Sequence, residues 1–137
     1  MSHSYKRLFF HIVWSTSKRT PSISKSIKKR LYDYIASLII KEGVELIAIG
    51  GSWDHVHILI KSNKLISIPK FVRYIKSCSS KFVNTINNLD YFAWQKGYGI
   101  FSVSPTRLKN AINYINNQEK HHKPYPFEKE LKLLLDL

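Results

Sequence analysis

A chain of 137 residues that is 44% hydrophobic is long enough to bury one ordinary core, so we expect a single domain over residues 1–137. Its 22 lysines and arginines against 9 acidic residues give a net charge of +13, and 13% of its residues are aromatic, which favours a partner with phosphates and unpaired bases. The single cysteine, Cys78, excludes an intrachain disulfide and a cysteine-based zinc cluster. A reducing cytoplasm is therefore the expected compartment, and Cys78 is expected to be a small buried helix residue.

The N-terminal part is predicted to hold a strand, a basic loop and a helix. Residues 7–14 are aromatic and β-branched on both faces, as in a central strand. This apolar run is too short for a membrane span, and no cleavage site for an export signal follows it, so we expect no membrane association. After a basic loop over residues 15–22, apolar residues recur at helical spacing from Ser24 to Glu42, with Ser24 as the cap and Gly43 as the stop.

Two further strands and a second helix follow. Residues 44–49 and 54–60 are predicted strands, joined by the Gly-Gly-Ser sequence at residues 50–52. The Ser-Ile-Pro sequence at residues 67–69 opens a helix whose apolar stripe extends to Ile86, with lysines and arginines beside the stripe.

The C-terminal part is predicted to add a strand and two helices. Residues 97–103, with glycines on both sides of a tyrosine, predict a short fourth strand. Ser104 followed by Pro105 predicts a helix that runs to about His121, and residues 127–135 predict a last helix. The order β-α-β-β-α-β indicates an α+β, ferredoxin-like (RRM-like) split βαβ fold, with a four-stranded antiparallel sheet and two helices on one face.

Two histidines, His55 and His57, form the most informative feature of the chain. Side chains alternate along a strand, so both imidazoles should point to one face while Val56 points to the other. The same alternation sends Asp54 away from the pair, and we therefore leave it out of the ligand set. A pair of this kind is commonly structural, so a metal site needs a third ligand.

The helix that begins at Ser104 carries a tyrosine and a glutamine one turn apart. Tyr114 and Gln118 are four residues apart, which predicts that they lie on one stripe at the edge of the buried face. Taken alone, the pair indicates a boundary tyrosine that packs above an exposed glutamine.

Three motifs in this order resemble the small single-tyrosine HUH transposases of bacterial and archaeal insertion sequences, which move as single-stranded DNA. The motifs are the Asp-His-Val-His sequence at residues 54–57, the run at residues 94–104, and residues 114–122, which begin Tyr-Ile-Asn-Asn-Gln. The resemblance extends from about Tyr5 to Leu131. It implies a single HUH transposase domain with a tyrosine-bearing helix added to the ferredoxin-like core.

The resemblance implies a role for each of four residues. In this family two histidines and a helix glutamine hold a divalent metal, and these fall on His55, His57 and Gln118, with Tyr114 as the nucleophile. Two imidazoles and an amide oxygen form an open, weakly charged site that suits Mg²⁺ or Mn²⁺. Tyr114 would attack a phosphorus of single-stranded DNA and leave a 5′-phosphotyrosine and a free 3′-hydroxyl. His121 is a candidate base by its helical stripe alone.

The resemblance also implies partners. Members of this family act as homodimers on hairpin-bearing ends of the mobile element, and the tyrosine helix can serve the metal site of its own chain or of the partner. The residues expected to face DNA are Lys18, Arg19, Arg73, Lys76, Lys81 and Arg107, the alternative being an ordinary solvated basic face. His3 and His11 have no partner in the pattern and are expected to be structural or exposed.

Two other functions stay open. The charge and the aromatic residues alone would also fit a non-catalytic module that binds single-stranded nucleic acid. A domesticated relative that nicks DNA for a host function would share every motif named above.

Overall fold

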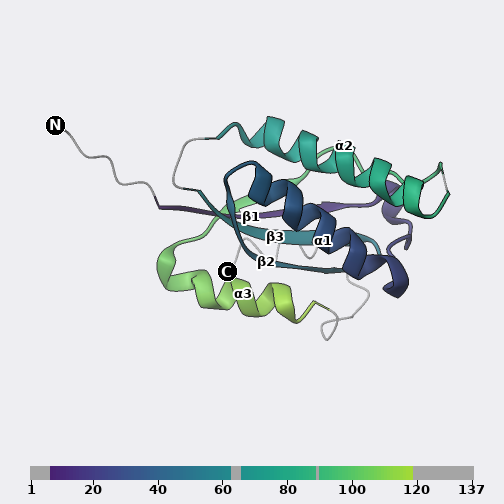
Figure 1. The fold of residues 1–137 in the computed structure, drawn as a ribbon. Coiled ribbons are helices and arrows are strands. Elements are labelled where there is room, and N and C mark those ends of the chain that lie inside the picture. Colours follow the sequence, from purple (N-terminus) through teal and green to yellow (C-terminus); the bar gives the residue numbers. More distant parts are fainter. Residues whose placement is uncertain (1–6, 63–65, 89, 119–137) are drawn as a thin grey trace.

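The computed structural model describes residues 7–62, 66–88 and 90–118, which form a four-stranded sheet with helices on both faces (Figure 1). The elements are β1 (Leu8–Ser15), α1 (Lys25–Lys41), β2 (Glu45–Ser52), β3 (His55–Ser62), α2 (Ile68–Ile86), β4 (Gly99–Ser102) and α3 (Leu108–Asn116), with 3-10 helices η1 (Ser17–Arg19) and η2 (Pro105–Arg107). The strands lie in the order β2-β3-β1-β4 and every pair is antiparallel. This topology confirms the predicted ferredoxin-like fold. Within the described ranges, no helix has the length and apolar character needed to cross a membrane.

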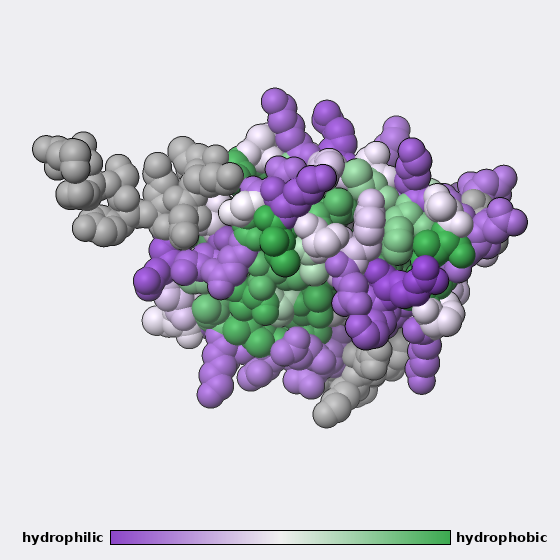
Figure 2. All heavy atoms as spheres, viewed as in Figure 1, coloured by the Kyte–Doolittle hydropathy of each residue, from purple (hydrophilic) through white to green (hydrophobic). Residues whose placement is uncertain are grey.

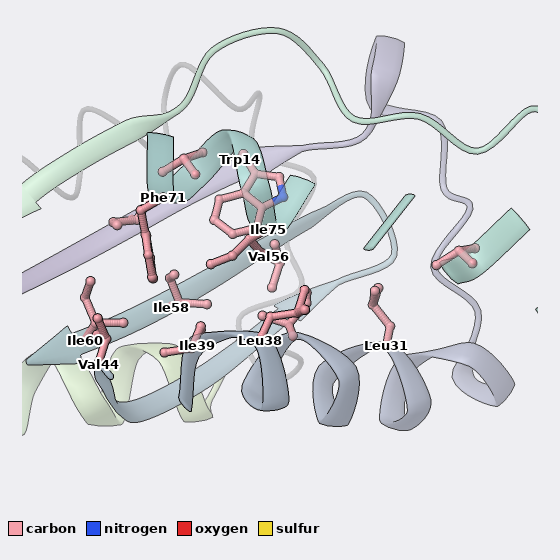
Figure 3. Close-up of a cluster of buried hydrophobic side chains, with 14 of the residues drawn as sticks. Trp14, Leu31, Leu38, Ile39, Val44, Val56, Ile58, Ile60, Phe71 and Ile75 are labelled. Carbon is pink, nitrogen blue, oxygen red and sulfur yellow. The ribbon is translucent and has the colours of Figure 1, made fainter. Parts of the chain in front are cut away.

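The main core lies between the sheet and the two long helices. Leu31 and Ile39 of α1, Phe71 and Ile75 of α2 and Trp14 of β1 all belong to this one buried cluster (Figure 3). Burying each such side chain stabilises the fold by about 1.5–3 kcal/mol. The helical periodicity read from the sequence therefore corresponds to the buried faces of α1 and α2. Cys78 of α2 packs partly buried against this core.

The third helix covers the opposite face of the sheet (Figure 1). Ala111 and Ile115 of α3 pack on Ala48 of β2 and Leu59 of β3 in a second, smaller apolar cluster. A helix of nine residues is marginal by itself, so its position depends on this packing. The surface in Figure 2 is hydrophilic around its rim, with an apolar area toward α3 and β2.

The turn between β2 and β3 lies further along the chain than predicted. Residues 50–52 belong to β2, where Gly50 pairs with His57, and residues 53–54 form the turn. Gly50 is needed for space rather than for a turn, because a Cβ at this position would lie 2.2 Å from the carbonyl oxygen of Ile115. The missing side chain lets the end of α3 approach the strand that adjoins His57.

The ends of the helices differ in part from the prediction. Gly43 stops α1 as predicted, with φ of 73°. The helix that was predicted to reach about His121 ends earlier, and Gln118 already lies in the turn beyond α3. The carbonyl of Asn113, in the last turn, accepts from both the backbone N–H of Asn117 at 3.1 Å and its side-chain Nδ2 at 2.8 Å. The predicted last helix, residues 127–135, lies outside the described residues.

Candidate active site

Strand β3 places two buried imidazoles on the face of the sheet that α3 covers. His55 is 5% exposed and His57 is fully buried, and their ring centroids are 4.9 Å apart. Val56, between them, lies in the main core on the other face. The predicted alternation of these three side chains is confirmed.

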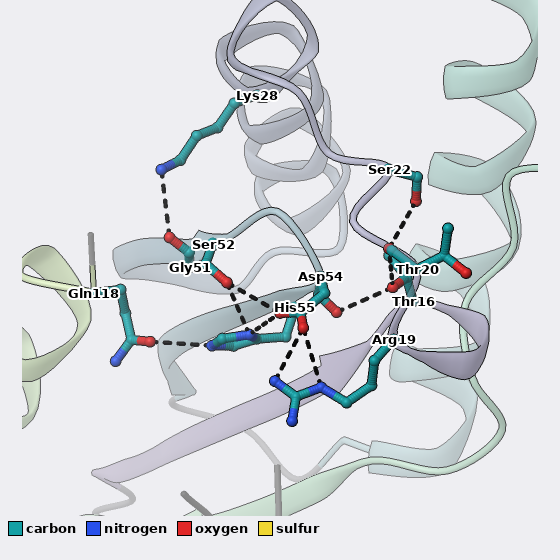
Figure 4. A network of polar contacts seen from close by, with 10 residues as sticks. All are labelled: Thr16, Arg19, Thr20, Ser22, Lys28, Gly51, Ser52, Asp54, His55 and Gln118. Atoms are coloured by element: carbon teal, nitrogen blue, oxygen red, sulfur yellow. Dashed lines mark hydrogen bonds and ion pairs between the residues drawn. The ribbon is translucent and has the colours of Figure 1, made fainter. Parts of the chain in front are cut away.

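Polar groups around the β2–β3 turn hold His55 in place (Figure 4). Its Nδ1 lies 2.7 Å from Oδ1 of Asp54 and 3.1 Å from the hydroxyl of Ser52. The hydroxyl also donates to Oδ1 at 3.0 Å, and Oδ2 forms an ion pair with Arg19 at 3.0 Å. The prediction that Asp54 points away from the histidines is wrong. Because β3 begins at His55, Asp54 belongs to the turn, where strand alternation does not apply.

The carboxyl of Asp54 is held in its ionised form. Burial alone would raise its pKa, but the hydrogen bond from His55, the charges of His55 and Arg19, and the hydrogen bond from Ser52 outweigh burial. The pKa of Asp54 therefore lies below its ordinary value. An ionised carboxylate can accept a hydrogen bond from Nδ1–H of His55 and fix the ring orientation.

A third histidine supports His57 from the neighbouring strand. His11 of β1 is 2% exposed, and its Nε2 lies 2.8 Å from Nδ1 of His57. His11 was expected to be structural or exposed; it is buried and structural, with a partner that the sequence pattern did not show. Alternation along β1 indicates which face of the strand His11 occupies. The sequence does not show that β1 pairs with β3 in the register that brings His11 beside His57.

Helix α3 brings the predicted tyrosine and glutamine to the histidines of the same chain. The ring centroid of Tyr114 lies 5.6 Å from that of His57 and 6.2 Å from that of His11. Gln118, 6% exposed, places Oε1 3.1 Å from Nε2 of His55. Gln118 reaches this position from the turn after the helix rather than from a helical stripe.

The hydrogen-bond partners of His55 and Gln118 test whether these side chains suit a bound cation. Nε2 of Gln118 donates to the carbonyl of Tyr114 at 3.3 Å, so Oε1 faces His55. His55 then has an acceptor at each nitrogen, the carboxylate of Asp54 at Nδ1 and the amide oxygen at Nε2, whereas a neutral imidazole carries only one proton. A doubly protonated ring would satisfy both acceptors; so would a cation bound to Nε2 and Oε1, which would leave the single proton at Nδ1, as is usual for metal-binding histidines.

The spacing of the donors is also suitable. Nε2 of His55 and Oε1 of Gln118 are 3.1 Å apart, close to the roughly 3 Å between adjacent ligands of an octahedral Mg²⁺. Among residues 7–62, 66–88 and 90–118, no group of three His, Cys, Asp or Glu side chains could hold a metal. A cation here would therefore depend on the neutral amide of Gln118 as well as on His55 and His57.

The basic residues predicted to face DNA differ in their surroundings. Four of them have exposed side chains: Lys18, Arg73, Lys81 and Arg107. Arg19 is partly buried by its ion pair with Asp54. Lys76 of α2 donates to the carbonyls of Gln95 at 2.5 Å and Gly97 at 2.9 Å, and burial lowers the pKa of its ammonium group.

Comparison with known proteins gives a consistent result. Residues 4–118 match the family of IS200-like transposases. The ISDra2 transposase TnpA of Deinococcus radiodurans is 25% identical over 118 residues, which are 82% of this chain and 84% of that protein. A crystal structure from D. radiodurans R1, assigned as a transposase, has a TM-score of 0.67 at 25% identity, covering 86% of this chain and 95% of that one.

A further solved structure agrees in fold. The REP-associated tyrosine transposase bound to a REP hairpin has a TM-score of 0.67 at 14% identity, covering 89% of this chain and 73% of that one. At this identity the likeness concerns the arrangement of strands and helices alone.

Proposed function

The chain belongs to the IS200-like transposase family, and on that premise we propose that it cuts and rejoins single-stranded DNA through Tyr114. The observation that carries this proposal is that α3 and the turn after it lie against the histidines of β3 in the same chain. The ring of Tyr114 lies beside His57, and the amide of Gln118 lies beside His55. The half-buried candidate nucleophile and three buried candidate ligands thereby lie in one cluster.

Tyr114 supplies the nucleophile of the proposed reaction. Its phenolic oxygen attacks the phosphorus of a phosphodiester and loses its proton, while the bond to the 3′ oxygen breaks and that oxygen gains a proton. The products are a 5′-phosphotyrosine and a free 3′-hydroxyl. Because one phosphodiester replaces another, a 3′-hydroxyl of another strand can attack the tyrosyl phosphate and reseal the DNA without a nucleotide cofactor.

His55, His57 and Gln118 would hold a divalent cation, for which Mg²⁺ and Mn²⁺ are the candidates. When bound, such a cation would supply a Lewis acid for the negative charge that develops on the phosphoryl oxygens. Asp54 forms a hydrogen bond with Nδ1 of His55, and His11 forms one with Nδ1 of His57. Their role in the proposal is to hold both imidazoles in one orientation.

The proposed substrate is single-stranded DNA with hairpins at the ends of a mobile element. The net charge of +13 and the exposed Lys18, Arg73, Lys81 and Arg107 support binding to a polyanion. The REP-associated relative, bound to a REP hairpin, makes hairpin DNA a reasonable probe. We further propose a homodimer that acts on cytoplasmic DNA, with Tyr114 serving the histidines of its own chain as the packing of α3 favours.

The test is the formation of a covalent protein–DNA adduct. The full chain is incubated with Mg²⁺ and with hairpin-bearing single strands taken from the DNA that flanks its coding sequence, and the products are separated under denaturing conditions. We expect an adduct that Tyr114→Phe abolishes and that chelation of the cation prevents. Tyr74→Phe is the matched control, because Tyr74 lies on α2 at the other face of the sheet.

The alternatives give different results in the same assay. Tight binding without a cation and without an adduct on any flanking strand would favour a non-catalytic single-stranded nucleic-acid-binding module. An adduct that persists in Tyr114→Phe would remove Tyr114 as the nucleophile. Cleavage without flanking hairpin ends in the genome would favour a domesticated nickase over a mobile transposase.

A further inference from the structure

A pocket of about 280 Å³ lies between the edge strand β4 and the beginning of α3. It is lined by His11, Phe101, Ser102, Val103, Ser104, Arg107, Asn110 and Ala111. Its residues come from β1, from β4 and the segment after it, and from the first turns of α3. The pocket is therefore built from parts of the chain that also position Tyr114.

The pocket shares a wall with the candidate active site. The ring centroid of His11 lies 6.2 Å from that of Phe101 and 6.2 Å from that of Tyr114. Asn110 and Tyr114 are four residues apart on α3, so both lie on one face of the helix. A group that fills the pocket would consequently lie next to the nucleophile.

The lining has the chemistry of a nucleotide site. Phe101 offers an aromatic ring on which a base can stack, the exposed guanidinium of Arg107 can pair with a phosphate, and the exposed amide of Asn110 can hydrogen-bond to a base edge. The described residues that line the pocket include no acid that would repel a phosphate. An apolar peptide side chain would leave the cation and the amide unused.

We propose that this pocket binds the base of one nucleotide that flanks the scissile phosphate. The proposal rests on the function proposed above, because it assigns a subsite to that reaction. A base held between Phe101 and Asn110, with its phosphate near Arg107, fixes the register of the strand relative to Tyr114. Such positioning lowers the barrier by presenting the phosphorus in the geometry of attack.

The experiment scans the DNA for the base that the pocket reads. A set of hairpin substrates carries a single abasic residue at each position around the cleavage site, and adduct formation is timed with enzyme in excess. We expect one flanking position at which the abasic residue slows wild-type adduct formation by on the order of tenfold, because loss of one stacked base has an effect of this size.

Substitutions in the pocket test whether Phe101 and Arg107 contact the nucleotide identified by the abasic scan. Phe101→Leu keeps an apolar side chain but removes the aromatic face, so it should slow the intact substrate about as much as the abasic residue does. Combining the two changes should add little, since both remove the same contact. Arg107→Gln should weaken substrate binding more than Lys109→Gln, a matched loss of one positive charge at an exposed position in the first turn of α3.

Each outcome separates this proposal from the function on which it rests. A wild-type adduct that forms equally with every abasic substrate would overturn the pocket proposal and leave the tyrosine mechanism standing. Full additivity of Phe101→Leu with the abasic residue, in a variant with wild-type thermal unfolding, would overturn it as well. Absence of an adduct with all substrates, intact ones included, would overturn both.

Discussion

Nε2 of His11 lies 2.8 Å from Nδ1 of His57, although 46 residues separate them in the chain. The antiparallel pairing of β1 and β3 brings the two buried rings together, with Val13 opposite His57. If His57 donates its Nδ1 proton to His11, its Nε2 carries the lone pair that a metal needs. This hydrogen bond therefore connects a residue of the sheet to the chemistry of the candidate site.

Replacing His11 should weaken cation binding without removing any ligand. Loss of a hydrogen-bonding partner of a metal ligand commonly costs about 10–100-fold in affinity, and we expect an effect of this size for His11→Phe. His11→Gln should recover part of the loss, because its amide oxygen can accept a hydrogen bond from Nδ1–H of His57. Titration with Mn²⁺, followed by electron paramagnetic resonance, measures the affinity. Equal affinities in the wild type and both variants would exclude the positioning role.

Asp54 should support the other histidine in the same way. Asp54→Asn keeps an oxygen that can accept a hydrogen bond from Nδ1–H of His55 but loses the negative charge, so we expect Mn²⁺ affinity to fall by about tenfold. The matched control is Asp33→Asn on α1, because the ion pair of Asp33 with Lys29 is exposed. A similar loss in both variants would indicate a general effect of net charge and would contradict the specific role of Asp54.

Much of the fold follows from local periodicity. The alternation of Val56 with the two histidines, and the helical spacing that includes Leu31 and Ile75, each identify a buried face before any partner is known. The order of strands and helices then leaves few topologies, and the observed sheet has the predicted one. The candidate ligands and the tyrosine were named from motifs and are brought together by this topology.

The remaining features depend on contacts between distant segments. Periodicity states which face His11 occupies but not which strand lies beside it, so its bond to His57 was missed. Gly50 was assigned to a turn because glycine commonly marks one, whereas here it makes room for the backbone of α3. Asp54 was placed on the wrong face because the predicted strand began one residue too early, so strand alternation was applied to a residue of the turn.

The close approach of α3 should make Gly50→Ala strongly disruptive at the site. The added Cβ would lie 2.2 Å from the carbonyl oxygen of Ile115, so either the helix end or the strand must move. We expect a loss of about 1–3 kcal/mol in the free energy of unfolding, with increased amide exchange concentrated in α3. Urea denaturation and hydrogen exchange measure the two effects.

Gly97→Ala provides the comparison for that substitution. Gly97 has φ of 89° and nothing within 4 Å of a Cβ, so its replacement costs backbone strain without a clash. Exchange in α3 should therefore stay at the wild-type level in Gly97→Ala. If Gly50→Ala leaves α3 equally protected, the close approach of helix and strand has no influence on the site.

Adding a cation should stabilise the folded chain by linkage. His55 and Gln118 are 63 residues apart, so the unfolded chain cannot present them together and should bind the cation far more weakly. Mn²⁺ at 100 times its dissociation constant should add about 2.7 kcal/mol to the free energy of unfolding. For a chain of this length, that corresponds to a rise in Tm of roughly 10 °C, which excess chelator should reverse.

The ligand set can be tested by the same measurement. Gln118→Ala should abolish most of the Mn²⁺-dependent rise in Tm, because it removes the amide oxygen that faces Nε2 of His55. Asn116→Ala, which removes an exposed amide at the end of α3, should retain the rise. Since each shift is taken against the same variant without metal, any effect of the substitution on helix stability cancels. Equal shifts in the two variants would show that the cation binds elsewhere and would remove Gln118 from the site.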